Sequence, residues 1–550
     1  MSRYWWPSVG VLAVFTYIYS LDGLHIPHIG DEAPYIQIVR LTAESDQWLP
    51  LKTATGLEDT KPPLLFWLGI VSSDWARHWS LIRLRFPIVL ITFLTAALVF
   101  LLADRMTGDR ESGFIAALTF LGFASTFQYG RPFLTNLPET LFVFLPFFLL
   151  LYFRDRRERG ETWFWMLIGV SVGIACLFKS FVLVVPVGVA LTWWLLLERG
   201  WHFEIFLKKD AFKIALALVL ALGCFALWPL LDPDPGSVIR NFVLEENLGK
   251  LGGESYISGL FTGAYPLHRI WLGHLANAGL FALPLVYLAL TGLTSVKGKA
   301  ALSLDKKSLW VLVLSFLIVY SVPSQRQENY LLPTVPALAV LIGVGWKEIE
   351  TRWFYLFNVA IVITLIPLAV LIHAVSDALP PGSYRWWQLG LPLVAILVTG
   401  VSLLWNRVSP YVFHLQVFLV AATVAAGLAP FEGPLGRYDH QSVEALESKT
   451  VYVPSNFISK YERHRFILPG SRIEGYHPSN TERRNQLLRS GKIVALERGL
   501  GQTVAGPFEV YGKRLTLRSR QRGDEIVRIL FEGELDLLVQ QEIIVRRRKQ

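Results

Sequence analysis

Long apolar runs separated by short polar connections fill the first 430 residues of the chain. Many of the runs approach about 20 residues, the length that an α-helix needs to cross the hydrocarbon core of a bilayer. We therefore predict thirteen membrane-spanning helices. They cover residues 8–21, 85–103, 113–130, 137–153, 163–178, 181–197, 211–231, 271–292, 308–323, 331–346, 354–375, 389–405 and 410–428.

The short connections indicate the orientation of these helices. Alternate connections are rich in Arg and Lys, as at residues 154–157 and 297–307, and short basic loops are retained in the cytoplasm. Thirteen spans then place the N-terminus in the cytoplasm and the C-terminus outside. The two long loops, residues 22–84 and 232–270, are also expected on the outer side.

The pattern changes after residue 430. Short β-branched or aromatic runs at residues 450–453, 492–496 and 508–511 alternate with turn residues and with a predicted helix at 481–490. This predicts a membrane domain over residues 1–430 and a small soluble extracytoplasmic α/β domain over residues 431–550. The basic end at 546–549 has two open interpretations, a solvated tail or a segment that meets anionic lipid.

Composition agrees with a membrane protein. Hydrophobic residues make up 53% of the chain and charged residues 17%, whereas a soluble protein carries about 25% charged residues. The first span is followed by further spans and by no small-residue cleavage site, so we expect an anchor and not a removed signal. Cys176 and Cys224 both fall in apolar spans, which excludes a disulfide framework between soluble segments.

Charged side chains beside a membrane are costly, so each one on the outer side is a candidate for function. Asp31 and Glu32 follow the first span closely, with Tyr35 one helical turn on. An Asp before a helical run also caps backbone N–H groups, which is the alternative role. The pair at this position favours acid–base chemistry at the membrane surface.

Lys61 precedes two prolines and a further apolar run. Proline restricts the backbone, so the direction in which the lysine leaves the chain is fixed. Its alternative role is that of an anchor whose ammonium reaches the interface. An acid pair and a lone cation near the bilayer together indicate chemistry on a charged lipid head group.

Three more outer segments carry polar side chains. Arg131 lies in the connection after the third span, where it could pair with Glu139. The 232–270 loop holds Glu246 and Lys250, and Arg326 and Tyr330 precede the tenth span. Arginine and tyrosine there can bind phosphate oxygens. A divalent metal held by carboxylates and a histidine stays an open alternative, since no tight ligand spacing supports it.

The order of these motifs resembles a known family. Asp-Glu-x-x-Tyr after the first span, Lys-Pro-Pro-Leu, an Arg in the next outer turn and a late Tyr-Leu-Leu-Pro are similar to the bacterial branch of the GT-C glycosyltransferases. That branch holds the aminoarabinose-to-lipid A transferases and their protein mannosyltransferase relatives. The resemblance covers about residues 5–430, and it implies transfer of a sugar from a polyprenyl-phosphate carrier on the outer side of the membrane.

The resemblance also implies roles for individual residues. Asp31 corresponds to the family's catalytic acid, and Lys61 to a cation that contacts the donor phosphate. Lys250 and Arg326 stand where the family often has phosphate-binding residues, and Tyr330 matches a tyrosine of the same cavity. The chain departs from the family at three positions, which leave the sugar and the use of a metal open. These are Pro34, Thr60 and Asn136.

The hypothesis from sequence is thus an inverting glycosyltransferase that needs no nucleotide and no nucleic acid. Its acceptor is a lipid such as lipid A, a glycan or a protein. A transporter of lipid-linked sugars should carry its charges near mid-membrane in both halves of the chain, whereas here they gather on one side. A glycan polymerase or ligase and a non-catalytic lipid-binding relative are also compatible with the pattern.

Overall fold

The computed structural model describes residues 4–25, 31–54, 56–58, 60–247, 249, 258–261, 265–294, 303–405, 409–455, 460–518 and 521–548. Lys250 lies outside these residues. The chain divides into two compact units. Unit 1 comprises Met1–Tyr17, Ile38–Arg77 and Arg85–Phe357, and unit 2 comprises Ile18–Gln37, His78–Leu84 and Asn358–Gln550.

Unit 1 is almost entirely helical. Its main helices are α1 (Trp5–Ile18), α3 (Leu64–Ser72), α4 (Leu81–Thr107), α5 (Arg110–Gly122), α6 (Ala124–Tyr129), α7 (Asn136–Tyr152), α9 (Thr162–Phe178), α10 (Val184–Glu198), α12 (Ala211–Leu231), α17 (Ala282–Thr294), α18 (Leu304–Ser321) and α19 (Val335–Gly345). The 22–84 and 232–270 loops also hold structure, namely α2 (Glu32–Ala43), whose first residues belong to unit 2, a hairpin of β1 (Leu51–Thr53) and β2 (Gly56–Glu58), and the π-helix η2 (Ile239–Asn247).

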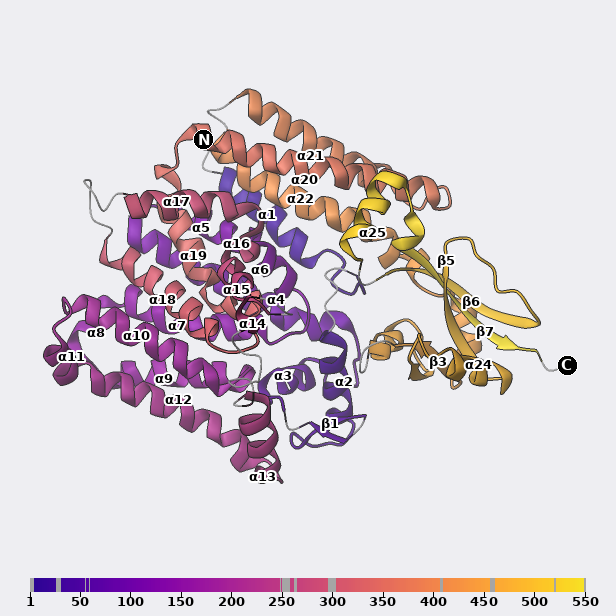
Figure 1. Ribbon diagram of the computed structural model, residues 1–550, viewed down its shortest axis with the longest axis horizontal. Coiled ribbons are helices and arrows are strands. Elements are labelled where there is room, and N and C mark those ends of the chain that lie inside the picture. Colours follow the sequence, from indigo (N-terminus) through magenta and orange to yellow (C-terminus); the bar gives the residue numbers. More distant parts are fainter. Residues whose placement is uncertain are drawn as a thin grey trace. The chain divides into compact units, whose positions relative to one another are not determined.

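Small residues let helices of unit 1 approach closely. Figure 1 shows α9 alongside α12, where a Cβ added at Gly169 would stand 2.6 Å from the Ala217 carbonyl oxygen. A Cβ at Gly173 would stand 2.5 Å from the Cβ of Cys224. Such contacts between small residues are the usual way in which helices pack within a membrane. Glycine is therefore required at both positions for this pair of helices.

Unit 2 contains α20 (Thr351–Ala378), α21 (Trp386–Leu404) and α22 (Ser409–Glu432), which run side by side in Figure 1. Buried polar side chains join them. The amides of Asn358 and Gln416 donate hydrogen bonds to the Ser402 hydroxyl at 3.1 and 2.7 Å. Hydrogen bonds between apolar helices add specificity to their packing.

Eight described helical segments are long and apolar enough to cross a membrane, and α1, α7 and α9 are shorter apolar helices. The chain is therefore a multi-pass membrane protein. Every predicted span overlaps a helix, but α18 begins with Asp305, Lys306 and Lys307, and the 113–130 segment is divided into α5 and α6. The number of thirteen spans remains a prediction.

A five-stranded sheet lies near the C-terminus in the order β4-β3-β5-β7-β6. Its strands are β3 (Thr450–Pro454), β4 (Arg472–Tyr476), β5 (Ile493–Gly499), β6 (Phe508–Leu517) and β7 (Val539–Arg547). β3 runs parallel to β4 and β5, whereas β7 runs antiparallel to β5 and β6. The predicted strands coincide with β3, β5 and β6, and the predicted helix coincides with α24 (Thr481–Arg489).

Part of the basic end of the chain belongs to the sheet. Arg546 and Arg547 are the last residues of β7, where they lie opposite Ile493 and Phe508. The Arg546 guanidinium also donates a hydrogen bond to the Gly491 carbonyl at 3.1 Å. Sheet pairing satisfies the backbone of these residues, so this part of the basic run is not a free tail, and its contact with anionic lipid stays a prediction.

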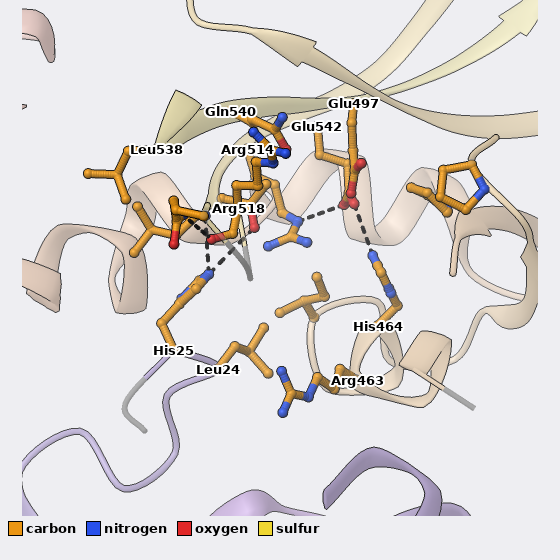
Figure 2. A pocket seen from close by; sticks show the side chains of 16 residues that line it. Leu24, His25, Arg463, His464, Glu497, Arg514, Arg518, Leu538, Gln540 and Glu542 are labelled. Carbon is orange, nitrogen blue, oxygen red and sulfur yellow. Dashed lines mark hydrogen bonds and ion pairs between the residues drawn. The ribbon is translucent and has the colours of Figure 1, made fainter. Parts of the chain in front are cut away.

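Glu542 on β7 is the centre of a buried ion network. Its carboxylate accepts hydrogen bonds from Arg514 Nε at 2.7 Å and from the Tyr438 hydroxyl, and it lies 3.0 Å from His464 Nε2. Burial would raise the pKa of Glu542, but the charges of Arg514 and His464 outweigh it and hold the pKa well below its usual range. Figure 2 shows Glu542, Arg514 and His464 at the wall of a cavity of about 450 Å³.

The network predicts a stability that depends on pH. The variant Glu542→Gln should lose about 3–5 kcal/mol of unfolding free energy at pH 7, because Arg514 stays buried without its carboxylate. The folded pKa lies below the unfolded value of about 4.3, so this stabilisation is complete above that value. It is lost as the pH falls through the folded pKa, and the difference between variant and wild type should shrink.

Hydrogen exchange of the β7 amides in the full-length protein, corrected for intrinsic rates, measures both the loss of stability at pH 7 and its dependence on pH. Glu482→Gln on α24 is a matched control, since Glu482 is exposed. A Glu542→Gln variant as stable as the wild type at pH 7 would contradict the assigned role of the network.

Candidate functional site

Lys61 and Glu246 meet although they are far apart in the sequence. Lys61 stands in front of Pro63, the residue that precedes α3, and Glu246 lies in η2. The Lys61 ammonium is 3.8 Å from a Glu246 carboxylate oxygen, and the side chains are 35% and 36% exposed. The sequence placed both residues among the substrate-binding candidates, and both remain accessible to a ligand.

A second ion pair lies between α7 and the residue that ends α9. Lys179 Nζ is 2.7 Å from a Glu139 carboxylate oxygen, and the Glu139 side chain is 1% exposed. The same ammonium stands 5.5 Å from the centre of the Tyr330 ring. Glu139 thus pairs with Lys179 and not with Arg131, the partner suggested by the sequence.

The two ion pairs are joined by a hydrogen bond between the residues that follow them. The Ser180 hydroxyl donates to the Asn247 side-chain carbonyl at 2.8 Å. Tyr330 completes the group, because its ring lies beside the Lys179 ammonium. We call the five side chains the Lys61–Tyr330 cluster. They are Lys61, Glu139, Lys179, Glu246 and Tyr330.

Arg131 and Arg326 lie deeper in unit 1. Arg131 is fully buried, and its guanidinium stands 5.4 Å from the centre of the Phe127 ring. Arg326 is 1% exposed, and it donates hydrogen bonds to the carbonyls of Ser321 and Tyr265 at 2.9 and 3.1 Å. In this structure both side chains hold parts of the protein in place, and their predicted contact with phosphate stays a prediction.

Asp31 and Glu32, the predicted acid pair, have different surroundings in unit 2. Asp31 is exposed and comes directly before α2, and its carbonyl accepts a hydrogen bond from the Tyr35 N–H at 3.4 Å. Glu32 is fully buried, with a carboxylate oxygen 3.7 Å from Arg463 Nη2. The exposed carboxylate of Asp31 is therefore the member of the pair that is open to a substrate.

The metal alternative finds no cluster in the described part of the chain. There, no three His, Cys, Asp or Glu side chains gather in a way that could hold an ion. His274, a histidine just after the 232–270 loop, is buried in the short helix α16 (Gly273–Ala278).

Chemically, the Lys61–Tyr330 cluster suits an anionic group that also carries hydroxyls. Its two ammonium groups can stabilise phosphate oxygens, and its two carboxylates can accept hydrogen bonds from sugar hydroxyls. Each ammonium is already paired with a carboxylate, which lowers the cost of holding the charge near the membrane. The cations that would bind a phosphate ester in the cluster are thus already held in place.

Two members of the cluster, Lys179 and Glu139, were not predicted as site residues, and Glu139 was considered only as a partner of Arg131. Lys179 lies between two short apolar runs. The available signal was the lone lysine itself, because an isolated charge that interrupts apolar sequence is costly and so points to function.

Sequence comparisons identify proteins that are similar to this chain. The family model described as dolichyl-phosphate-mannose-protein mannosyltransferase matches residues 28–233. The chain is 27% identical to undecaprenyl phosphate-alpha-4-amino-4-deoxy-L-arabinose arabinosyl transferase 2 of Pseudomonas fluorescens, over 62% of this chain and 59% of that one. It is 23% identical to the Proteus mirabilis protein of the same name, over 70% and 69%. The chain spans about three-fifths of the first relative.

The fold gives an independent comparison. The crystal structure of ArnT from Cupriavidus metallidurans bound to undecaprenyl phosphate superposes with a TM-score of 0.63, over 98% of each chain and at 15% identity. At this identity the match shows the fold alone. Sequence and fold together confirm that the chain resembles the GT-C glycosyltransferases of the aminoarabinose transferase and protein mannosyltransferase type.

Proposed function

We propose that this protein is an integral-membrane glycosyltransferase. It transfers a sugar from a polyprenyl-phosphate carrier to a lipid, glycan or protein acceptor on the outer side of the membrane. The observation that carries the proposal is the Lys61–Tyr330 cluster, in which five distant segments bring two cations, two carboxylates and a tyrosine together. Similarity to arabinosyl transferases and mannosyltransferases supports the reaction class.

In the proposed reaction, the acceptor hydroxyl attacks the anomeric carbon of the sugar. The new carbon–oxygen bond forms as the bond to the carrier phosphate breaks, so the configuration inverts. Asp31 takes the acceptor proton as general base. Lys61 stabilises the charge that develops on the departing polyprenyl phosphate. Lys179 and Tyr330 bind the same phosphate or the sugar beside it.

The relatives suggest which donor to test first. Their names specify 4-amino-4-deoxy-L-arabinose carried on undecaprenyl phosphate. Lipid A is then the first acceptor to examine, in a bacterial inner membrane with the N-terminus in the cytoplasm and the C-terminal sheet outside. Thr60 and Asn136 depart from the pattern of those transferases, so mannose and other sugars belong in the same panel.

Mass spectrometry of envelope lipids and glycoproteins tests this function in cells. Cells that lack the protein should lose a sugar from one lipid or glycoprotein and accumulate the undecaprenyl-phosphate donor. A transporter would also remove the product, but its donor would accumulate on the cytoplasmic side, where externally added periodate does not reach it. Identical lipids and glycoproteins with and without the protein would overturn the proposal.

A further inference from the structure

The helix that follows Asp31 is fixed by polar contacts with one short segment of the C-terminal region. That segment is η9 (Lys460–Phe466), a 3-10 helix between β3 and β4. Asp31 stands immediately before α2, and its carbonyl is bonded to the first turn. The position of the Asp31 carboxylate therefore depends on where the start of α2 is held.

Two buried side chains of α2 reach η9. Glu32 is fully buried and lies 3.7 Å from the guanidinium of Arg463, whose side chain is 9% exposed. Gln37, which is 2% exposed, donates hydrogen bonds to the Tyr461 hydroxyl at 2.9 Å and to the Glu462 carboxylate at 3.3 Å. Three consecutive residues of η9 thus bind the same helix.

A buried carboxylate constrains its surroundings more strongly than an exposed one. Desolvation makes the ionised form costly, and the cost is offset only while a cation stays close in good geometry. Glu32 therefore ties the start of α2 to Arg463. Gln37 adds hydrogen bonds whose loss would leave buried polar groups unsatisfied.

The segment η9 is itself held by the sheet. His464, the residue after Arg463, lies 3.0 Å from Glu542 on β7, and Glu542 accepts a hydrogen bond from Arg514 on β6. Figure 2 shows His464 turned towards Glu542 and Arg463 turned in another direction. A continuous series of contacts thus runs from the sheet through η9 to α2.

We propose that Arg463 and Glu32 are positioning residues that set the orientation of Asp31. This inference rests on the proposed function, in which Asp31 is the base, and it gives the C-terminal region a role in the reaction. Glu32 then acts through Arg463 and need not touch the substrate. A shift of about 1 Å in a reacting group can cost about 100-fold in rate, so the effect should be measurable.

The kinetic test uses the full-length protein in proteoliposomes that contain lipid A. Undecaprenyl phosphate-linked 4-amino-4-deoxy-L-arabinose is the donor, and release of undecaprenyl phosphate is followed. Arg463→Ala should lower kcat about 10- to 100-fold at an unchanged KM for the donor. Arg463→Lys, which keeps the cation, should recover most of the loss. Arg472→Ala, at an exposed arginine of β4, should behave like the wild type.

Coupling between the two residues provides a sharper criterion. If they act as a pair, Glu32→Gln combined with Arg463→Ala should lose no more activity than Arg463→Ala alone. If Arg463→Ala does not accumulate, Tyr461→Phe removes only the hydroxyl that accepts from Gln37 and should give a smaller fall in kcat. Additive losses from Glu32→Gln and Arg463→Ala would overturn the pairing.

Hydrogen exchange provides a readout that needs no substrate. In Arg463→Ala, the amides of the first turns of α2 should exchange faster than in the wild type, whereas those of β7 should not. Unchanged exchange in α2 overturns the positioning role, whatever the activity. If Asp31→Asn keeps full activity, the proposed base is wrong. If Asp31→Asn is inactive but Arg463→Ala and Glu32→Gln keep wild-type activity, only the positioning inference fails.

Discussion

Replacing the exposed acid, Asp31→Asn, is expected to lower kcat for sugar transfer by about 100- to 10,000-fold, the usual contribution of a general base. Asparagine has nearly the shape of aspartate but cannot take the proton from an acceptor hydroxyl. Because Asp31 is exposed and lies before α2, the substitution should not disturb packing. Protein level and membrane insertion should therefore equal those of the wild type.

Asp46→Asn is the matched control for this variant. Asp46 is exposed and has a φ of 51°, a left-handed conformation that asparagine tolerates well. It should retain full activity. Full activity in Asp31→Asn would remove the base from the proposed reaction, whereas loss of activity in both variants would point to a general effect of charge.

Removing the cation from the Lys61–Tyr330 cluster, Lys61→Met, should lower kcat about 100- to 1,000-fold, as expected when one group that stabilises developing negative charge is lost. Methionine keeps the length and much of the apolar stem of lysine. Glu246, 3.8 Å away, would then lose the Lys61 cation and would repel the phosphate of the donor. Binding of undecaprenyl phosphate should weaken as well.

Lys52→Met on β1 is the control, and turnover together with binding of undecaprenyl phosphate is the measurement. Lys61→Arg separates charge from shape, because it keeps the cation but spreads it over a planar group. Partial activity in Lys61→Arg is expected. A Lys61→Met variant with wild-type turnover would show that this cation does not act on the leaving group.

Much of the helical framework could be predicted because a membrane-spanning helix can be recognised from its own apolar sequence. The helices α12 and α20 coincide closely with their predicted ranges. The start of α18 and the break between α5 and α6 were harder to predict. Charged residues lie in the first turn of α18, and the extended backbone at Phe123 separates α5 from α6. Local hydropathy cannot tell whether such a segment still crosses the membrane.

The sheet contains a strand, β7, that the pattern of apolar and polar residues does not predict. The strand β7 contains Gln540, Gln541 and Glu542, which break the alternation expected of a half-buried strand. Glu542 is buried only because Arg514, His464 and Tyr438 come to it from other elements. These partners are distant in sequence, so the strand could be recognised only once the fold had assembled them.

The candidate site, too, could be predicted only in part from the sequence. Lys61, Glu246 and Tyr330 could be chosen as polar residues of outer segments, and the structure brings them into one cluster with Lys179 and Glu139. The sequence could not tell that Glu139 prefers Lys179 to Arg131. The sequence also could not show that Asp31 is exposed whereas Glu32 is buried and paired with Arg463.

Turnover of a defined donor by the purified protein tests the central claim most directly. The full-length protein is reconstituted with undecaprenyl-phosphate-linked sugars and envelope lipids, and both released undecaprenyl phosphate and the sugar-bearing acceptor are quantified. The account predicts equal amounts of the two products from at least one donor, and neither product with Asp31→Asn. Movement of intact donor across the membrane, with no undecaprenyl phosphate released, would contradict it.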